Sequence, residues 1–386
     1  MKYIVIDLYS AQPIGKTIYH GGGEYIKTIF RAFSDKYYNK ANEMIIVCYE
    51  TNKFLDDWIL RTIKEKNFCI KNVCSLSEII NWVNEFAQNG DVRFFSGLPY
   101  HYDKFNFPQN VISIGTLHGL RSVEKQTDKY LLKYYRGKGL LKEIVKKILK
   151  KPLFEKYYSV YENTINNFDV IITDSIHSAY SIRINYPNII KNKKIEVFYP
   201  ITQKITSFCN QYDNEDKYIM LISADRWIKN SYRGLKAIDE LFSKQYLSGY
   251  SVRVYGNAPK RIRDSIKNKE HFIFYEYVSS EELEKAYRKC DILFYPTLNE
   301  GFGNVPMEAM KYGKTCVVSS VCSLPEIYKD TVYWCNPYDV MEMENRIMQA
   351  VENKIDTRKI FDRLEQLYFR QNKDMDKLLD LIIGTK

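Results

Sequence analysis

The feature that most constrains this chain is a regular alternation of short apolar runs with helical patterns along its 386 residues. Candidate strands in the first half are 2–9, 44–50, 67–73, 91–97, 110–117, 170–175 and 195–200, and helical spacing appears at 23–36, 77–88 and 175–185. The second half repeats the alternation, with candidate strands at 218–223, 252–256, 272–278, 291–296, 315–320 and 331–335. Such alternation predicts an α/β protein with parallel sheets covered by helices on both faces.

The length allows two domains, and the segment 203–217 is polar and poor in pattern, as a linker would be. We therefore expect an N-terminal Rossmann-like domain over 1–205 and a C-terminal one over 206–370. A final helix over 371–386 either packs within the second domain or returns to the first. Ligands of doubly wound sheets bind at the carboxyl ends of strands, so we look for function there.

Composition narrows the setting of the protein. A hydrophobic share of 45% suits a globular chain. The start, "MKYIVIDLYS", reads as a strand, and no apolar run approaches the ~18 residues that span a bilayer. Eight cysteines show no C-x2-C spacing. A cytoplasmic, reducing location is expected.

The net charge of +10 is concentrated in "RGKGLLKEIVKKILKK" (136–151). Helical spacing places leucine, isoleucine and valine on one face of this segment and lysines around the other. Such a helix either lies on an anionic membrane surface or packs its apolar side against the protein. No helix-turn-helix, zinc or RNA-binding motif is evident, so nucleic acid is not an expected partner.

The stretch "NEGFGNVPMEAM" (299–310) follows the candidate strand "DILFYP" and leads into helical spacing. It reads as strand, glycine loop and helix N-terminus, a corner whose free backbone N–H groups can hold a phosphate. Glu300 and Glu308 flank this corner, and a carboxylate can accept two hydrogen bonds from a vicinal sugar diol. The corner therefore suggests a site for a sugar joined to phosphate.

The longer segment "NEGFGNVPMEAMKYGKTCVVSSVCSLPEI" (299–327) resembles the donor-site signature of retaining GT-B glycosyltransferases, specifically glycosyltransferase family 4. Weaker matches are "TLHGL", "TDSIHS", "IEVFYP" and "KNSYRGLKAI". The resemblance implies the GT-B fold, which has two doubly wound Rossmann-like domains facing a central cleft. It also implies that Glu308 binds ribose hydroxyls and that Glu300 contacts the transferred sugar. The backbone of Gly301, Phe302, Gly303 and Asn304 would approach the sugar and phosphates.

The resemblance further implies cations for the leaving diphosphate. Lys229 matches the family lysine that neutralises this group. The usual family arginine lies five residues earlier, where this chain has Ala224, so Arg226 is proposed on chemistry more than on alignment.

In the N-terminal half, His118 matches a family histidine that hydrogen-bonds the donor sugar. Gly22 and Gly23, in "HGGGEY", match a glycine-rich loop that lets backbone approach the phosphates or the acceptor.

These matches imply a retaining transferase that needs no cofactor. A metal-independent reaction is expected because no D-x-D motif is visible. It would use a nucleotide-sugar donor, UDP- or GDP-linked, and a glycan or lipid-linked acceptor in cell-surface polysaccharide synthesis. An NAD-dependent dehydrogenase would need G-x-G-x-x-G after the first strand, which "YSAQPIGKTIYHGGGEY" does not supply. A catalytically silent binding or membrane-association protein on the same scaffold is the alternative.

Overall fold

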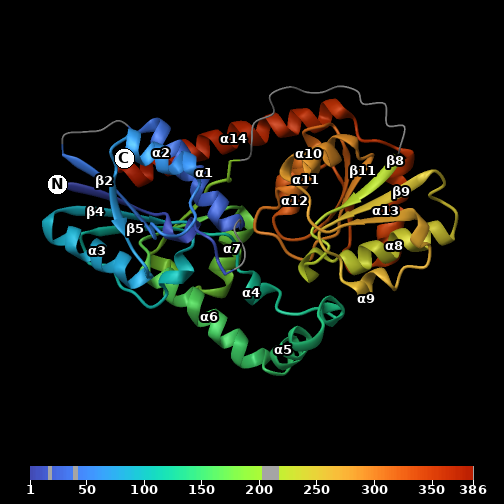
Figure 1. The fold of residues 1–386 in the computed structure, drawn as a ribbon, viewed down its shortest axis with the longest axis horizontal. Helices are drawn as coiled ribbons and strands as arrows, with labels where there is room; N and C mark the ends of the chain where they lie inside the picture. The colour runs from blue at the N-terminus through green and yellow to red at the C-terminus, as the bar shows by residue number, and fades with distance from the viewer. Residues whose placement is uncertain (16–19, 38–41, 202–216, 386) are drawn as a thin grey trace. The chain divides into compact units, whose positions relative to one another are not determined.

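The computed structural model describes residues 1–15, 20–37, 42–201 and 217–385, and it divides into two compact units. The first unit comprises Met1–Leu120, Glu155–Ile201 and Arg370–Lys386. The second unit comprises Arg121–Phe154 and Thr202–Phe369. Each unit is an α/β layer structure built on its own sheet, as Figure 1 shows.

The first unit contains a seven-stranded parallel sheet in the order β3-β2-β1-β4-β5-β6-β7. Its strands are β1 Lys2–Asp7, β2 Glu43–Tyr49, β3 Cys69–Asn72, β4 Asp91–Ser96, β5 Val111–Leu117, β6 Val170–Thr173 and β7 Lys194–Val197. Its main helices are α1 Gly21–Lys36, α2 Asp57–Glu65, α3 Leu76–Asn89 and α7 Ile176–Asn185. The strands and helices expected from the alternation in this half are confirmed.

The central strands of this sheet read as continuous apolar runs because both faces are covered. In β1, every residue after Lys2 is buried. One face packs against α1, whose Ile26, Phe30 and Phe33 lie in the main core cluster with Ile4 and Ile6. Burial on both faces is what a parallel sheet between helix layers requires, and it fixes the register of each strand.

The second unit contains a six-stranded parallel sheet in the order β10-β9-β8-β11-β12-β13. Its strands are β8 Lys217–Leu221, β9 Tyr250–Tyr255, β10 Phe272–Tyr275, β11 Ile292–Tyr295, β12 Thr315–Ser319 and β13 Tyr333–Cys335. Its helices include α8 Ser231–Ser243, α9 Lys260–Arg263, α10 Ser280–Lys289, α11 Val305–Met310, α12 Leu324–Tyr328 and α13 Val340–Glu352. The six strands expected in this half are confirmed.

In each sheet the chain first adds strands toward one edge and then toward the other. The change occurs between β1 and β4 in the first sheet and between β8 and β11 in the second. At such a switch point the loops from neighbouring strands leave in opposite directions and open a crevice at the carboxyl edge. The loop after β8 carries Arg226 and Lys229, and the loop after β11 carries Glu300. The topology thus brings the second unit's predicted residues to its switch point.

The basic segment differs from expectation in its extent. The predicted single helix over 136–151 is two helices, α5 Gly137–Ile148 and α6 Lys150–Asn167, with the chain leaving helical geometry at Leu149. Residues 121–154 belong with the second unit, although the expected N-terminal domain was 1–205. Within the described part of the chain, no helix combines the length and apolarity needed to cross a membrane.

The predicted terminal helix is also longer than expected, because α14 runs from Thr357 to Ile383. Its last part joins the first unit, where Met375, Leu378 and Ile382 enter the core cluster. Asp374 accepts a hydrogen bond from the backbone N–H of Tyr199 at 3.1 Å. The expected linker 203–217 lies almost wholly outside the described residues, and the domain boundaries at 205 and 370 stay a prediction.

Candidate functional site

The centre of the candidate site in the second unit is a buried ion pair. Lys229 ends η5 (Trp227–Lys229), directly before α8, and its side chain is largely buried. Its Nζ donates to Oε1 of Glu300 at 2.5 Å. The two residues are 71 positions apart in sequence and come from the two loops at the switch point. The structure therefore brings together two residues that sequence motifs predicted separately.

Two hydroxyl groups complete the environment of this pair. The Tyr295 hydroxyl, at the end of β11, donates to Glu300 Oε1 at 2.6 Å, and the Thr297 hydroxyl donates to the same oxygen at 2.8 Å. Burial alone would raise the pKa of Glu300, but the Lys229 ammonium and these donors hold it below its usual value. Glu300 is therefore an anion, and a ligand group that approaches Lys229 competes with it.

Two further cations act on Lys229. Burial lowers the pKa of the Lys229 ammonium, Glu300 opposes that shift, and the charges of Arg226 and Arg121 add to it. Arg226 is exposed at the start of η5. Arg121 begins α4 (Arg121–Glu124) and was not predicted. With one of these three cations paired to Glu300, the surroundings of Lys229 keep a net positive charge that favours a polyanion such as a diphosphate.

The glycine loop after Glu300 is held by α12. Ser323 Oγ donates to the carbonyl of Phe302 at 2.9 Å, and the Tyr328 hydroxyl donates to the carbonyl of Gly303. Gly303 has φ +90, and a Cβ there would lie 2.4 Å from Leu324. Only glycine fits this position. Gly301 and Asn304 complete the loop, with Asn304 exposed at the start of α11.

Glu308 lies in the first turn of α11 and forms its ion pair with Lys311, not with the Lys229–Glu300 pair. Its Oε2 accepts from Lys311 Nζ at 2.8 Å, and the side chain of Glu308 is 37% exposed while that of Lys311 is 9% exposed. The lysine holds one carboxylate oxygen and leaves the group open to solvent. An exposed, oriented carboxylate of this kind can accept a diol.

In the first unit, His118 directly follows β5 and has both ring nitrogens engaged. Nδ1 lies 2.6 Å from Oδ2 of Asp174, and Nε2 lies 3.0 Å from the carbonyl oxygen of Gly97. Burial would lower the pKa of His118, but Asp174 raises it above its ordinary value. Two acceptors require two N–H donors, so the ring is an imidazolium. The predicted contact of His118 with a donor sugar stays a prediction.

The predicted glycine loop begins α1. His20, for which no role was predicted, caps this helix: its Nδ1 accepts a hydrogen bond from the backbone N–H of Gly23 at 3.0 Å. A Cβ on Gly22 would lie 2.5 Å from Leu98, and one on Gly23 would lie 2.9 Å from the His20 ring. Both glycines are therefore needed for close packing at this corner. Their predicted approach to phosphate or acceptor stays a prediction.

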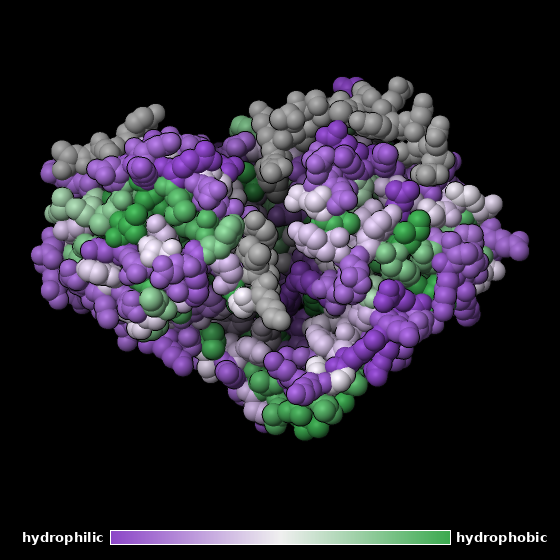
Figure 2. All heavy atoms as spheres, viewed as in Figure 1, coloured by the Kyte–Doolittle hydropathy of each residue, from purple (hydrophilic) through white to green (hydrophobic). Residues whose placement is uncertain are grey.

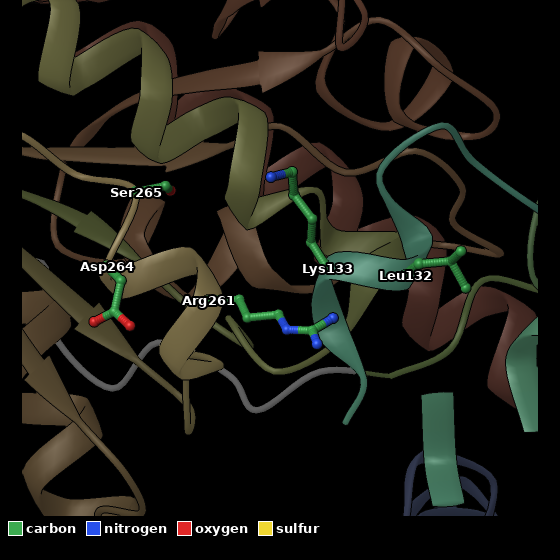
Figure 3. Close-up of a pocket in the computed structure, with 5 residues that line it drawn as sticks. All are labelled: Leu132, Lys133, Arg261, Asp264 and Ser265. Atoms are coloured by element: carbon green, nitrogen blue, oxygen red, sulfur yellow. The ribbon is translucent and has the colours of Figure 1, made fainter. Parts of the chain in front are cut away.

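A separate hollow of about 480 Å³ opens between η3 (Leu131–Tyr134) and α9, lined by Leu132, Lys133, Arg261, Asp264 and Ser265. In Figure 3 the Arg261 guanidinium points toward η3, whereas the Asp264 carboxylate points away from it. None of these five lining residues belongs to the predicted donor site. We assign the hollow no role in the site.

Sequence reasoning missed several residues that the fold brings to the site. Tyr295 stood in the quoted stretch "DILFYP" and Thr297 directly follows it, but the two read only as strand and loop. Asp174 stood in "TDSIHS", 56 positions from His118, so only the pairing of β5 with β6 brings it near. Lys311 could have been found, because it lies three residues after Glu308 on one helix face.

Comparison with known proteins agrees with this geometry. Residues 203–365 match the family model described as glycosyl transferases group 1. This match covers the sheet and the loops that carry Lys229, Glu300 and Glu308. Residues 203–365 thus match a group 1 glycosyltransferase domain, which we call the group 1 domain.

Proteins similar to this chain include bacterial mannosyltransferases. The serotype-specific mannosyltransferase WbdA of Escherichia coli is 22% identical over 222 residues, which are 53% of this chain and 27% of that protein. The O-antigen chain mannosyltransferase RfbU of Salmonella typhimurium is 24% identical over 210 residues, 51% of this chain and 55% of that protein. The chain thus spans between about a quarter and about half the length of these relatives.

Solved structures extend the likeness to the whole chain. Sucrose-phosphate synthase from Thermosynechococcus elongatus superposes with a TM-score of 0.66 at 13% identity, covering 100% of this chain and 98% of that one. Anabaena Alr3699/HepE, solved in complex with UDP, gives 0.63 at 14% identity and covers 100% and 99%. At these identities the likeness shows the fold, which is GT-B.

Proposed function

We propose that this protein is a retaining glycosyltransferase that moves a sugar from a nucleotide sugar to a glycan or lipid-linked acceptor in polysaccharide synthesis. The observation that carries the proposal is the buried Lys229–Glu300 pair at the switch point of the group 1 domain. It joins a cation suited to a leaving diphosphate with a carboxylate suited to sugar hydroxyls. Exposed Glu308 lies on the same loop–helix corner and supplies the acceptor pair for a ribose.

The reaction follows from the charges at this corner. As the bond from the anomeric carbon to the β-phosphate oxygen breaks, negative charge grows on that oxygen. Lys229, with Arg226 and Arg121 adding positive potential, stabilises the growing charge without a metal ion. The acceptor hydroxyl attacks the same face that the phosphate leaves, and its proton passes to the departing phosphate oxygen. Bonds and protons balance, and the anomeric configuration is retained.

The comparisons support a choice of substrates to test first. WbdA and RfbU are mannosyltransferases, and this makes mannose the first candidate sugar. The HepE structures hold UDP or UDP-glucose, and this supports a nucleotide-sugar donor for the shared fold. We therefore propose a UDP- or GDP-linked hexose as the donor.

The proposal is tested by calorimetric titration of the folded protein with UDP, GDP, ADP and CMP. We expect one of the first two to bind. Glu308→Ala should then weaken that binding roughly tenfold or more, because hydrogen bonds to a charged group contribute about 1.5–3 kcal/mol. Glu281→Ala, on the exposed first turn of α10, is the matched control and should bind as wild type does.

Unchanged affinity in folded Glu308→Ala would remove this residue from the site. Binding of a nucleotide without release of nucleoside diphosphate from any nucleotide sugar would favour the alternative, a catalytically silent binding protein on this scaffold. The intact Lys229–Glu300 pair argues for activity, because an ion pair buried at a cost in desolvation has no evident structural use here.

A further inference from the structure

The helix α5 presents an apolar face that the protein does not cover. Leu141, Val145 and Ile148 are 64%, 51% and 76% exposed, and Ile144 and Leu149 are exposed as well. No residue of α5 is buried. Figure 2 shows hydrophobic residues gathered over the helix that Figure 1 labels α5. The structure thus decides against the packed alternative that the sequence left open.

The side of α5 that does contact the protein is a different one. At 3.6 residues per turn, Gly139, Glu143 and Lys146 lie opposite the exposed arc, and all three are partly covered, as is Leu140 at the flank of the arc. A Cβ on Gly139 would meet the ring of Tyr135 at 3.8 Å, and Glu143 pairs with Lys146 at 2.6 Å. The more covered side of the helix is therefore mostly small and polar, and the apolar stripe faces outward.

Lysines border that stripe on both sides. On the helical wheel, Lys138 and Lys142 lie along one edge of the exposed arc and Lys147 lies along the other, and all three are exposed. Long lysine side chains can lie along apolar surface while their ammonium groups reach the headgroup level. A second copy of this chain would bring like-charged edges together. The pattern matches an anionic leaflet instead.

The helix is fastened to the second unit at its N-terminal side. The Tyr134 hydroxyl accepts from the backbone N–H of Tyr232 at 2.8 Å, at the start of α8. Arg233 and Asp128 form a two-bond ion pair, each bond 3.0 Å. α8 itself begins at Ser231, two residues after Lys229. A surface that held α5 would therefore hold the group 1 domain.

We propose that α5 lies in the headgroup region of an anionic lipid leaflet, inserting Leu141, Val145 and Ile148 while Lys138, Lys142 and Lys147 contact lipid phosphates. This interaction surface goes beyond the proposed transferase activity and does not depend on it.

The test is sedimentation of the full-length protein with vesicles of phosphatidylcholine, alone or mixed with phosphatidylglycerol. Wild type should bind only the mixed vesicles, and binding should fall as salt rises. Lys138, Lys142 and Lys147 changed together to glutamine should lower the partition coefficient roughly 100-fold at low salt, since each lysine near the surface contributes about fivefold. The same change at Lys260, Lys269 and Lys289, exposed lysines outside α5, should have little effect.

A second pair of variants tests whether the apolar stripe contributes to vesicle binding, because the chain contains a matched control for Ile148. Ile148 is 76% exposed and Ile184, in α7, is 75% exposed. Ile148→Gln should lower binding to mixed vesicles about tenfold, and Ile184→Gln should not. Equal binding by folded Ile148→Gln and wild type would overturn insertion. A wild-type dimer that Ile148→Gln makes monomeric, without any change in vesicle binding, would assign the stripe to a second copy and overturn the proposal.

Discussion

Glu300 and Lys229 show how much one contact changes the interpretation of single residues. Sequence motifs placed each near a donor, one for sugar hydroxyls and one for diphosphate. The structure adds that they neutralise each other, with Tyr295 and Thr297 donating to the same carboxylate oxygen. A donor diphosphate that binds Lys229 must therefore compete with Glu300, which already pairs with this lysine. We infer that the pair stores a preorganised charge arrangement, which needs little rearrangement when charge develops on the leaving group.

Replacing Lys229 should separate binding from chemistry. Lys229→Met should lower kcat by on the order of 100-fold or more and raise KM much less, because the cation acts on charge that grows toward the transition state. Lys236→Met, exposed on α8, is the control. Steady-state kinetics with the donor identified by calorimetry would measure both constants. An equal loss in binding and no change in kcat would make Lys229 a ground-state contact only.

The His118–Asp174 pair predicts how stability depends on pH. The pKa of folded His118 lies above its ordinary value of 6.5. The pair's contribution is therefore fully present below that value and is lost as pH rises through the folded pKa. Urea unfolding of wild type at increasing pH should show this loss. Asp174→Asn should be less stable at low pH and should lose less on going to high pH. Parallel pH profiles for the two proteins would contradict the assignment.

At the scale of elements, the segment before α5 has the most consequential contacts. Arg233 joins Asp128 to Asn230, donating to Asn230 Oδ1 at 2.9 Å. Asn230 has φ 58 and directly follows Lys229, and its amide donates to the carbonyl of Pro296 at 3.0 Å. The segment 121–134 thus reaches the loop that carries Lys229 through two side chains, and we regard Arg233 as a positioning residue.

Removing the charge of Asp128 should be costly. Asp128→Asn leaves Arg233 buried without its ion pair, and breaking such a pair costs about 3–5 kcal/mol. The exposed pair Glu284–Arg288 is the control, and Glu284→Gln should cost less than about 1 kcal/mol. Urea unfolding measures both. If Asp128→Asn cost no more than the control, the segment would not be anchored through this pair.

The elements themselves were largely predictable from the sequence. The strands of both sheets have periods and lengths that a local reading detects, because burial on both faces produces continuous apolar runs. The wrong predictions concern helix ends and long-range contacts, which the local hydrophobic pattern does not determine. Helical spacing continues across Leu149, but the helix ends there, and α14 starts well before the terminal stretch that was recognised. Asp128 and Asp174 were missed because their partners are far along the chain.

At the scale of the whole molecule, two parallel sheets each place basic and acidic side chains at the carboxyl ends of their strands, His118 and Asp174 in the first and Lys229 and Glu300 in the second. The second of these sheets lies in the group 1 domain, and the structural likeness covers the entire chain. The exposed face of α5 adds a surface that the transferase chemistry does not require. We therefore propose that the loops after β8 and β11 bind the donor, whereas α5 holds the protein at an anionic membrane surface.

The central claim is transfer from a nucleotide sugar with retention, driven by Lys229 and Glu300. Its most direct test is time-resolved proton NMR of UDP- and GDP-hexoses incubated with the protein and a lipid extract as acceptor, in the presence of a chelator. We predict that one donor releases nucleoside diphosphate, that the first-formed glycoside keeps the donor's anomeric configuration, and that Lys229→Met abolishes the signal. Inverted configuration, or folded wild type that cleaves none of these donors, would contradict the account.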